Sequence, residues 1–146
     1  MSVLVGGGGG FIGSHLVRKL VERGEDVVIC DLSPNMALLR DLVEKVKIVR
    51  GDATNIADIL HAVKKHGVKD IYHLIALLAD VSRENPLLAL KVNVESTLNF
   101  LEASRIMNLN QVIFASSVAV HDPQEKPPVA ESAPLRLDLF TGRQRS

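Results

Sequence analysis

Five consecutive glycines, Gly6 to Gly10, stand between a short apolar run at residues 3–5 and an apolar helical pattern that begins at Phe11. The spacing G-x-x-G-x-x-G is formed by Gly7, Gly10 and Gly13. Glycine tolerates the positive φ angles that a sharp strand-to-helix turn can need. Because glycines lack Cβ atoms, a pyrophosphate can lie against the backbone N–H groups at the helix N-terminus. Glycine runs are often flexible linkers, but the strand and helix on either side predict a phosphate-binding loop.

Asp31 ends the next apolar run, Val27 to Cys30, and follows Gly13 by 18 residues. This is close to the spacing expected of an acid that binds the ribose of a dinucleotide. A carboxylate there accepts hydrogen bonds from the adenosine hydroxyls and repels a 2′-phosphate, and no Arg or Lys stands at positions 30–36 to attract one. Alone, Asp31 would be an ordinary polar residue at a strand end. Together with the glycine loop, it predicts binding of NAD rather than NADP.

A second group of reactive side chains is a weaker candidate. Ser116 and Ser117 with His121 and Asp122 could suggest a hydrolase, but the sequence has no G-x-S-x-G elbow. The roles in a catalytic triad depend on geometry rather than on closeness in sequence. We therefore favour a non-triad interpretation. Cys30 is expected to be a small buried hydrophobe rather than a nucleophile.

The elements that position these residues alternate regularly. Strands are predicted at residues 3–5, 27–30, 46–49, 70–74 and 111–115. Helices are predicted at residues 11–23, 34–44, 56–66 and 86–107. Gly24 and Gly67 have the positions of C-terminal glycine caps, and Asn85-Pro86 is a typical helix start. The alternation predicts an α/β fold, a doubly wound parallel sheet of about five strands with right-handed crossovers.

Five short motifs follow one another over nearly the whole interval 3–121. They are Gly7-Gly8-Gly9-Gly10-Phe11-Ile12-Gly13, Gly51-Asp52-Ala53, His73-Leu74-Ile75-Ala76, Asn93-Val94-Glu95-Ser96-Thr97 and Ala115-Ser116-Ser117-Val118-Ala119-Val120. With these motifs the chain resembles the extended short-chain dehydrogenase/reductase family, the NAD-dependent epimerases and dehydratases. The resemblance implies a Rossmann-type fold and NAD as the cofactor.

The resemblance also implies roles for individual residues. Asp52 would hydrogen-bond the adenine amino group, with Ala53 beside it, and the segment 74–76 would follow the ribose and nicotinamide side of the cofactor. Asn93 matches the family's structural asparagine, and Ser117 matches the serine that hydrogen-bonds the reacting oxygen of the substrate. The predicted cofactor-binding residues are Gly7, Gly10, Phe11, Ile12, Gly13, Asp31, Asp52, Ala53, Leu74, Ile75, Ala76 and Asn93, and the predicted catalytic residue is Ser117.

The C-terminal region departs from the family's pattern. We expect an NAD-binding Rossmann domain at residues 1–121 and an irregular, Pro-rich tail at residues 122–146. The family has a Tyr-x-x-x-Lys helix, in which a tyrosinate acts as acid and base and the lysine lowers its pKa. Phe140 and Gln144 occupy the positions of that pair. We therefore expect the chain to be truncated before this helix and to lack the C-terminal strands and the substrate lobe.

Two functions from different classes follow from these observations. The first is the NAD(H)-binding domain of an NAD-dependent epimerase/dehydratase-like oxidoreductase that acts on a nucleotide-sugar or a small hydroxy substrate. Within it, three stretches also resemble the family's threonine dehydrogenases: His73–Ala79, Asn85-Pro86 and Ser116–Val120. The second is a non-catalytic NAD-binding module, which the missing Tyr/Lys pair favours. Whether the chain is itself an enzyme stays open at this point.

Composition excludes several partners. Lys and Arg number 17, as do Asp and Glu, so net charge gives no reason to expect nucleic acid or an anionic membrane surface. The longest apolar run, residues 71–79, is too short to span a bilayer. His61 and His66 do not share a helix face, and no metal site is predicted. The N-terminus lacks the pattern of a signal peptide, and a single cysteine fits a reducing compartment, so we expect a cytoplasmic protein.

The predicted helix 86–107 has apolar residues on more than one face. One of these faces should lie away from the sheet, and exposed apolar area of that size usually marks an interface. We therefore expect a homo-oligomer that forms through this helix.

Overall fold

The chain divides into two units, Met1–Ala115 and Ser116–Ser146. The structure, a computed structural model, describes residues 1–117, 120 and 129–133. The first unit contains β1 (Ser2–Gly6), α1 (Phe11–Glu22), β2 (Asp26–Asp31), β3 (Lys47–Arg50), α2 (Ile56–His66), β4 (Asp70–His73), α3 (Ala79–Glu84), α4 (Pro86–Ala89), η1 (Leu90–Glu95), α5 (Ser96–Met107) and β5 (Gln111–Phe114). His121, Phe140 and Gln144 lie outside the described residues, so the expectations about the tail stay predictions.

The five strands form one parallel sheet in the order β3-β2-β1-β4-β5. Val3 pairs with Val27 on one side and with Asp70 on the other. β2 and β3 therefore lie on one side of β1, and after a crossover connection β4 and β5 lie on the other side. This arrangement confirms the predicted doubly wound α/β fold. It leaves a crevice at the carboxyl ends of β1 and β4, where the order reverses.

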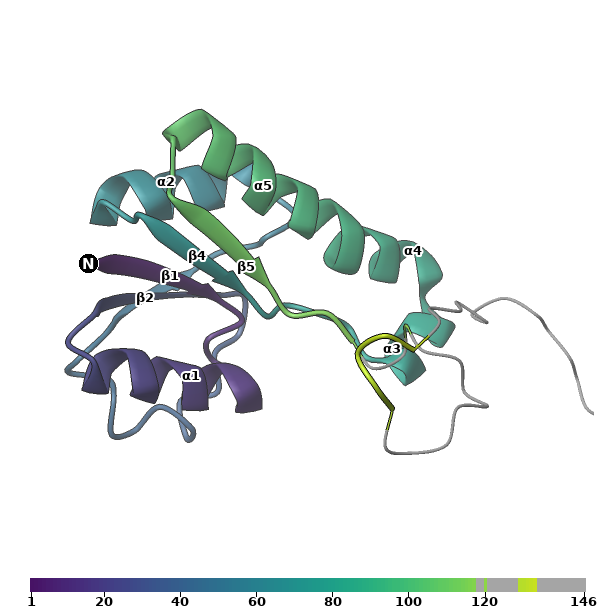
Figure 1. The fold of residues 1–146 in the computed structure, drawn as a ribbon, viewed down its shortest axis with the longest axis horizontal. Helices are drawn as coiled ribbons and strands as arrows, with labels where there is room; N and C mark the ends of the chain where they lie inside the picture. Colours follow the sequence, from purple (N-terminus) through teal and green to yellow (C-terminus); the bar gives the residue numbers. More distant parts are fainter. Residues whose placement is uncertain (118–119, 121–128, 134–146) are drawn as a thin grey trace, which may run out of the picture. The chain divides into compact units, whose positions relative to one another are not determined.

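Helices cover both faces of the sheet, with α1 on one side and α2 and α5 on the other (Figure 1). Alternate residues along β1 divide between the two faces, because side chains of a strand point in opposite directions in turn. The buried residues on the α1 side are Val3, Val5, Val17, Leu20, Val27, Ile29, Leu39 and Leu42. Those on the other side are Leu4, Val28, Cys30, Ala53, Ile59, Ala62, Val63, Val68, Ile71, Phe100 and Ala103. The neighbouring strands β1 and β2 have consecutive buried apolar residues because both faces of the sheet are covered there.

The segment predicted as a helix at residues 34–44 forms a series of turns instead. The Asn35 side chain accepts a hydrogen bond from the Ala37 N–H at 3.0 Å, and short-range bonds such as Leu42 N–H to the Leu39 carbonyl follow. Local side-chain bonding of this kind competes with helix formation. Leu39 and Leu42 are nevertheless buried, so the segment packs into the core without forming the predicted helix.

The helix predicted at residues 86–107 is one helical path with a wider turn in it. Its middle part, η1, is a π-helix between α4 and α5. The Ser96 hydroxyl bonds the Val92 carbonyl, and the Thr97 hydroxyl bonds the Asn93 carbonyl at 2.9 Å. Hydroxyls that bond carbonyls four residues back distort a helix, which gives a local cause for the wider turn. The structure also adds α3, a short helix that the sequence pattern did not predict.

In the part of the chain that the structure describes, none of the helices combines the length and apolar character that crossing a bilayer requires.

Candidate cofactor-binding cleft

The glycine loop connects β1 to α1 through a tight turn. Gly7 donates its N–H to the Cys30 carbonyl at 2.9 Å and has a φ of 77°, which disfavours other residues. A Cβ at Gly13 would lie 2.1 Å from the Gly7 carbonyl oxygen, so α1 can approach the loop only with glycine there. Gly10 is the N-cap residue of α1 and provides no side-chain cap. The N–H groups of the first helical turn can therefore bind an anion.

Asp31 lies at the end of β2, next to this loop. One carboxylate oxygen accepts the Gly9 N–H at 3.0 Å, and the other accepts the Ser33 N–H at 3.0 Å. These two bonds fix the direction of the carboxylate and connect the glycine loop to the turn after β2. A carboxylate oxygen can accept more than one hydrogen bond, so Asp31 can also bind ribose hydroxyls without releasing the loop.

Asp52 follows β3 and closes the adjoining turn. One of its carboxylate oxygens accepts hydrogen bonds from the N–H and the hydroxyl of Thr54, both at 2.8 Å. The Asp52 N–H donates to Asp58 at 2.9 Å, and the Asn99 side chain donates to the Ala53 carbonyl at 3.0 Å. The backbone around Asp52 is thus held by α2 and α5. The proposed bond from Asp52 to an adenine stays a prediction.

His73, at the end of β4, is completely buried. Its Nε2 lies 2.9 Å from the Thr97 hydroxyl, which itself donates to the Asn93 carbonyl at 2.9 Å. The hydroxyl oxygen is therefore the acceptor from His73 Nε2–H, and Nδ1 accepts the Ile75 N–H at 3.4 Å. Burial lowers the pKa of His73 to about 4. The ring is neutral at pH 7 and connects the strand end to η1 and α5.

Asn93 holds the loop that follows β4 by both ends of its amide. Its side-chain oxygen accepts the Leu77 N–H at 2.7 Å, and its side-chain nitrogen donates to the Leu77 carbonyl at 3.2 Å. The paired bonds fix the backbone one residue beyond the segment 74–76. Asn93 therefore has a positioning role, which is consistent with the structural asparagine that the sequence resemblance implied.

A cavity of about 260 Å³ lies at the carboxyl ends of the strands. Its lining residues that the sequence predicted are Gly7, Gly10, Asp31, Asp52, Ala53, Leu74, Ile75 and Ala76. Its lining residues that were not on the predicted list are Leu32, Gly51, Thr54, Val92 and Ser96. Leu32, Gly51 and Thr54 directly adjoin predicted residues, so sequence neighbourhood could have indicated them. Val92 and Ser96 are recognisable only once η1 is placed beside the cleft.

Five predicted residues do not line this cavity. Phe11 and Ile12 are exposed on the first turn of α1, Gly13 packs under the loop, and Asn93 acts through Leu77. Ser117 belongs to the second unit, and its predicted catalytic role stays a prediction.

Cys30, near the carboxyl end of β2, is buried, as predicted. Burial raises the pKa of its thiol to about 11. The thiol is therefore protonated at neutral pH and is not a nucleophile there. Among the residues that the structure describes, no three His, Cys, Asp or Glu side chains form a group that could hold a metal ion.

The sequence and the fold both match known proteins over most of this chain. Residues 3–138 match the NAD dependent epimerase/dehydratase family. A UDP-glucose 4-epimerase of Erwinia amylovora is 34% identical over 144 residues, covering 92% of this chain and 42% of that protein. A UDP-glucose 4-epimerase of Klebsiella pneumoniae is 34% identical over 139 residues, covering 90% of this chain and 100% of that protein.

Solved structures give the same result. The UDP-glucose 4-epimerase of Thermus thermophilus in complex with NAD has a TM-score of 0.81 and 31% identity, covering 93% of this chain and 44% of that one. The UDP-glucose 4-epimerase of Stenotrophomonas maltophila, with bound NAD and formylated UDP-arabinopyranose, has a TM-score of 0.84 and 29% identity. The match covers 93% of this chain and 43% of that one. The chain thus spans less than half the length of the Erwinia protein and of both crystallised chains.

Proposed function

The chain belongs to the NAD-dependent epimerase/dehydratase family, and we propose that it is the NAD-binding part of an oxidoreductase of that family, acting on a nucleotide-sugar. The observation that carries the proposal is the cleft at the carboxyl ends of the strands. It brings together a glycine loop with an uncapped helix N-terminus and a fixed carboxylate at Asp31. Anion-binding N–H groups beside a ribose-binding acid fit a dinucleotide.

Each residue of the cleft has a separate part in this proposal. The N–H groups at the start of α1 bind the pyrophosphate, and Asp31 accepts hydrogen bonds from the adenosine ribose. Asp52 and Ala53 contact the adenine, and the segment 74–76 follows the nicotinamide side, held in place by Asn93 through Leu77. When bound, NAD supplies a hydride acceptor and donor for chemistry at a carbinol carbon.

The nucleotide-sugar class is proposed from the relatives, whose names are UDP-glucose 4-epimerase. Ser117 is proposed to hydrogen-bond the reacting oxygen of that substrate. A threonine dehydrogenase-like activity is the variant that His73–Ala79 and Asn85-Pro86 favour. The second class of function is a non-catalytic NAD-binding module, and Phe140 and Gln144 at the positions of the family's Tyr and Lys support it.

Titration calorimetry of the full chain with NAD and with NADP tests the proposal. NAD should bind at least about tenfold more tightly, because the Asp31 carboxylate repels a 2′-phosphate. Asp31→Asn keeps an acceptor for the loop but removes the charge, so it should reduce the preference. Asp26→Ala removes an exposed carboxylate at the other end of the same strand and is the matched control. Equal binding of both cofactors by the unsubstituted chain would contradict the proposal.

A second assay separates an enzyme from a binding module. Epimerisation of UDP-sugars is followed by chromatography of the sugar products, because it gives no net NADH, and NADH formation is followed with L-threonine, both at saturating NAD. Tight NAD binding without turnover supports the module, because loss of a positioned acid/base costs on the order of 10²–10⁴ in rate. Turnover that Ser117→Ala abolishes supports the enzyme. The cytoplasmic location and the homo-oligomer also stay predictions.

A further inference from the structure

A positively charged side chain lies next to Asp31 on the neighbouring strand. In the parallel pairing of β2 with β3, Asp31 is opposite Arg50. The ladder continues past the end of β3, where the Gly51 N–H donates to the Asp31 carbonyl at 3.2 Å. Neighbouring strands of a sheet lie about 4.8 Å apart, so the backbone of Arg50 is held close to that of the proposed ribose-binding acid.

Both side chains leave the sheet on the same face, the one that α1 covers. Ile29 and Ile48 are partners in the same ladder, and both pack in the core on the α1 side. Side chains along a strand alternate between the two faces, so Asp31 and Arg50, each two residues further along, return to that face. The hydrogen bond from the Gly9 N–H to the Asp31 carboxylate, which connects β2 to the loop before α1, agrees with this direction.

The guanidinium of Arg50 has no partner among the residues that the structure describes. Arg50 is exposed at the end of its strand, and its side chain takes part in no hydrogen bond or ion pair with that part of the chain. Arg18, by contrast, is committed to the Asp41 carboxylate and the Leu38 carbonyl. An unpaired guanidinium keeps all of its N–H donors, and its planar fork matches the oxygens of a phosphate.

The phosphate that this position can meet is one on the 2′-oxygen of an adenosine ribose. Asp31 is proposed to bind the hydroxyls of that ribose, so a group on the 2′-oxygen would lie beside its carboxylate. The carboxylate repels a phosphate there, and a guanidinium from the adjacent strand attracts it. The sequence around Asp31 contains no such cation, because Arg50 follows Asp31 by 19 residues and only the pairing of β2 with β3 brings the two together.

We propose that Arg50 is a second determinant of cofactor specificity, a cation site for the 2′-phosphate of NADP that acts against Asp31. The inference rests on the proposed function, because it needs the adenosine ribose to bind at Asp31. NAD remains the preferred cofactor, and Arg50 limits how strongly NADP is rejected. Replacing Asp31 alone is then sufficient to admit NADP, since the cation is already in place.

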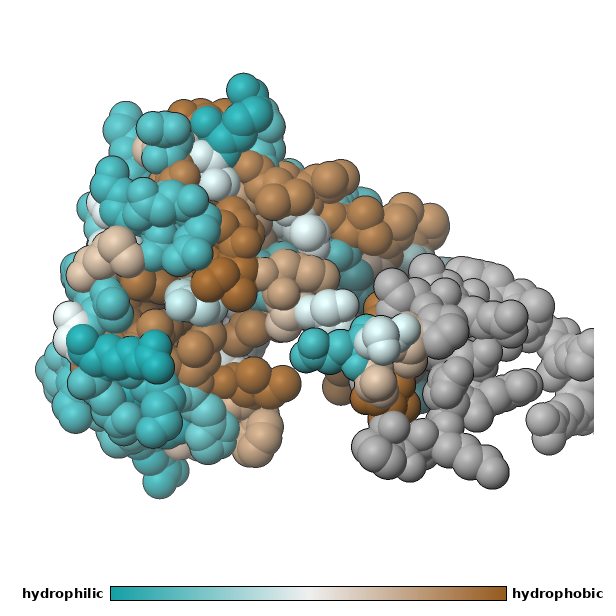
Figure 2. All heavy atoms as spheres, in the orientation of Figure 1, coloured by the Kyte–Doolittle hydropathy of each residue, from teal (hydrophilic) through white to brown (hydrophobic). Residues whose placement is uncertain are grey.

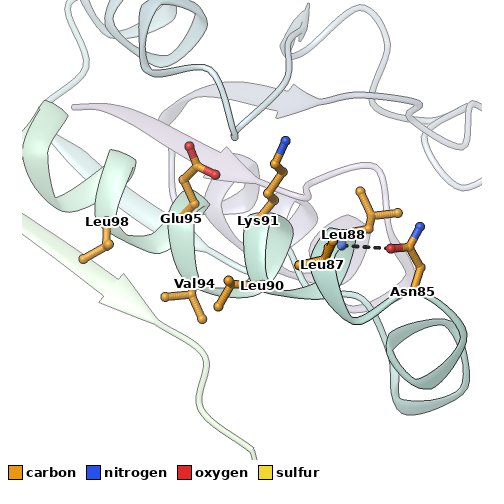
Figure 3. A pocket seen from close by; sticks show the side chains of 8 residues that line it. All are labelled: Asn85, Leu87, Leu88, Leu90, Lys91, Val94, Glu95 and Leu98. Carbon is orange, nitrogen blue, oxygen red and sulfur yellow. Dashed lines mark hydrogen bonds between the residues drawn. The ribbon is translucent and has the colours of Figure 1, made fainter.

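Arg50 is on the opposite face of the sheet from the surface through which a homo-oligomer is expected. Figure 2 shows brown surface along α4, η1 and α5, and Figure 3 shows Leu90, Val94 and Leu98 along one side of this helical path, where they line an open groove. In Figure 1, α5 covers the face of the sheet away from α1. A substitution of Arg50 should therefore change cofactor binding without changing association, which sedimentation of each variant checks.

Titration calorimetry of the full chain with NAD and with NADP tests the role of Arg50. Arg50→Gln should weaken NADP binding by about fivefold and leave NAD binding unchanged. Arg50→Lys keeps the charge but not the planar fork, so it should retain part of the NADP affinity. Arg23→Gln makes the same exchange at an exposed position beyond the far end of α1, a twelve-residue helix or about 18 Å from the glycine loop. This control should change neither dissociation constant.

The Asp31→Asn background makes NADP binding easier to measure, because the repulsion is removed. NADP should bind this variant more tightly than it binds the parent chain, and adding Arg50→Gln should weaken NADP again by about fivefold while NAD is unaffected. If Arg50→Gln left NADP binding unchanged in both backgrounds, or weakened NAD and NADP equally, the inference would be overturned and the proposed function would stand. Absence of NAD binding by the parent chain would overturn both.

Discussion

Lowering the pH from about 7 to about 5 should destabilise this domain through one buried side chain, His73. The ring is completely buried, with Phe100 and Phe114 at centroid distances of 4.6 and 5.4 Å. Its Nδ1 accepts the Ile75 N–H, so a proton there would set two donors against each other. Burial lowers the pKa of His73 from 6.5 to about 4 in the folded chain.

The sign and size of the effect follow from this difference. Between pH 4 and 6.5 the unfolded chain binds the proton and the folded chain does not, so stability rises with pH in that window. The stability that depends on a neutral His73 is fully present above the pKa of the unfolded chain and is lost as the pH falls toward the pKa of the folded chain. One pKa unit corresponds to about 1.4 kcal/mol, so acidification from pH 7 to pH 5 should cost on the order of 2 kcal/mol.

Urea unfolding at the two pH values measures this cost. His73→Gln keeps a side-chain donor for Thr97 but cannot titrate, so its stability should differ much less between pH 7 and pH 5. Subtracting the variant's stability difference between the two pH values from that of the parent chain removes the contribution of the other titrating groups. His61→Gln, at an exposed position of α2, is expected to keep the full difference. If His73→Gln retained the same pH dependence as the parent chain, the reasoning from burial would be refuted.

Two other substitutions test the cleft. Gly13→Ala should lower the free energy of unfolding by about 3 kcal/mol and abolish the heat of NAD binding, because the new methyl would meet the Gly7 carbonyl oxygen. Gly24→Ala is the control, at a position where no atom lies within 4 Å and φ is +79°. It should cost only about 1–2 kcal/mol and leave NAD binding intact. Asn93→Ala should cost about 1–3 kcal/mol in thermal unfolding and weaken NAD binding several-fold in calorimetry, because Leu77 loses both of its side-chain partners. Asn93→Asp keeps the acceptor for the Leu77 N–H but sets a carboxylate oxygen against the Leu77 carbonyl, so it should lower stability and binding as well.

The order of strands and helices could be predicted because each boundary has a local cause. The predicted helix 56–66 coincides with α2. At its start the Asn55 side chain accepts the Ala57 N–H at 3.1 Å. At its end Gly67 has a φ of 60° and serves as a left-handed C-cap. Signals of this kind depend only on neighbouring residues, so sequence reasoning can use them.

The parts that sequence reasoning missed depend on contacts far along the chain. The π turn arises where Ser96 and Thr97 bond back to the helix and also face His73, about 23 residues away. Ser96 belongs to one of the quoted motifs but was not among the predicted site residues, although it is buried and lines the cleft. Its role follows from the placement of η1 beside β4, which no local pattern contains.

The central position of β1 has a consequence for the folding of the nascent chain. Val3 finds its first neighbour at Val27 but its second only at Asp70, about 67 residues later. At synthesis rates of about 5–20 residues per second, that residue follows about 3–13 s afterwards. Until then, one edge of β1 has unpaired N–H and C=O groups, which can pair with another chain. The yield of folded protein therefore depends on the crowding of nascent chains as well as on the stability of the finished sheet.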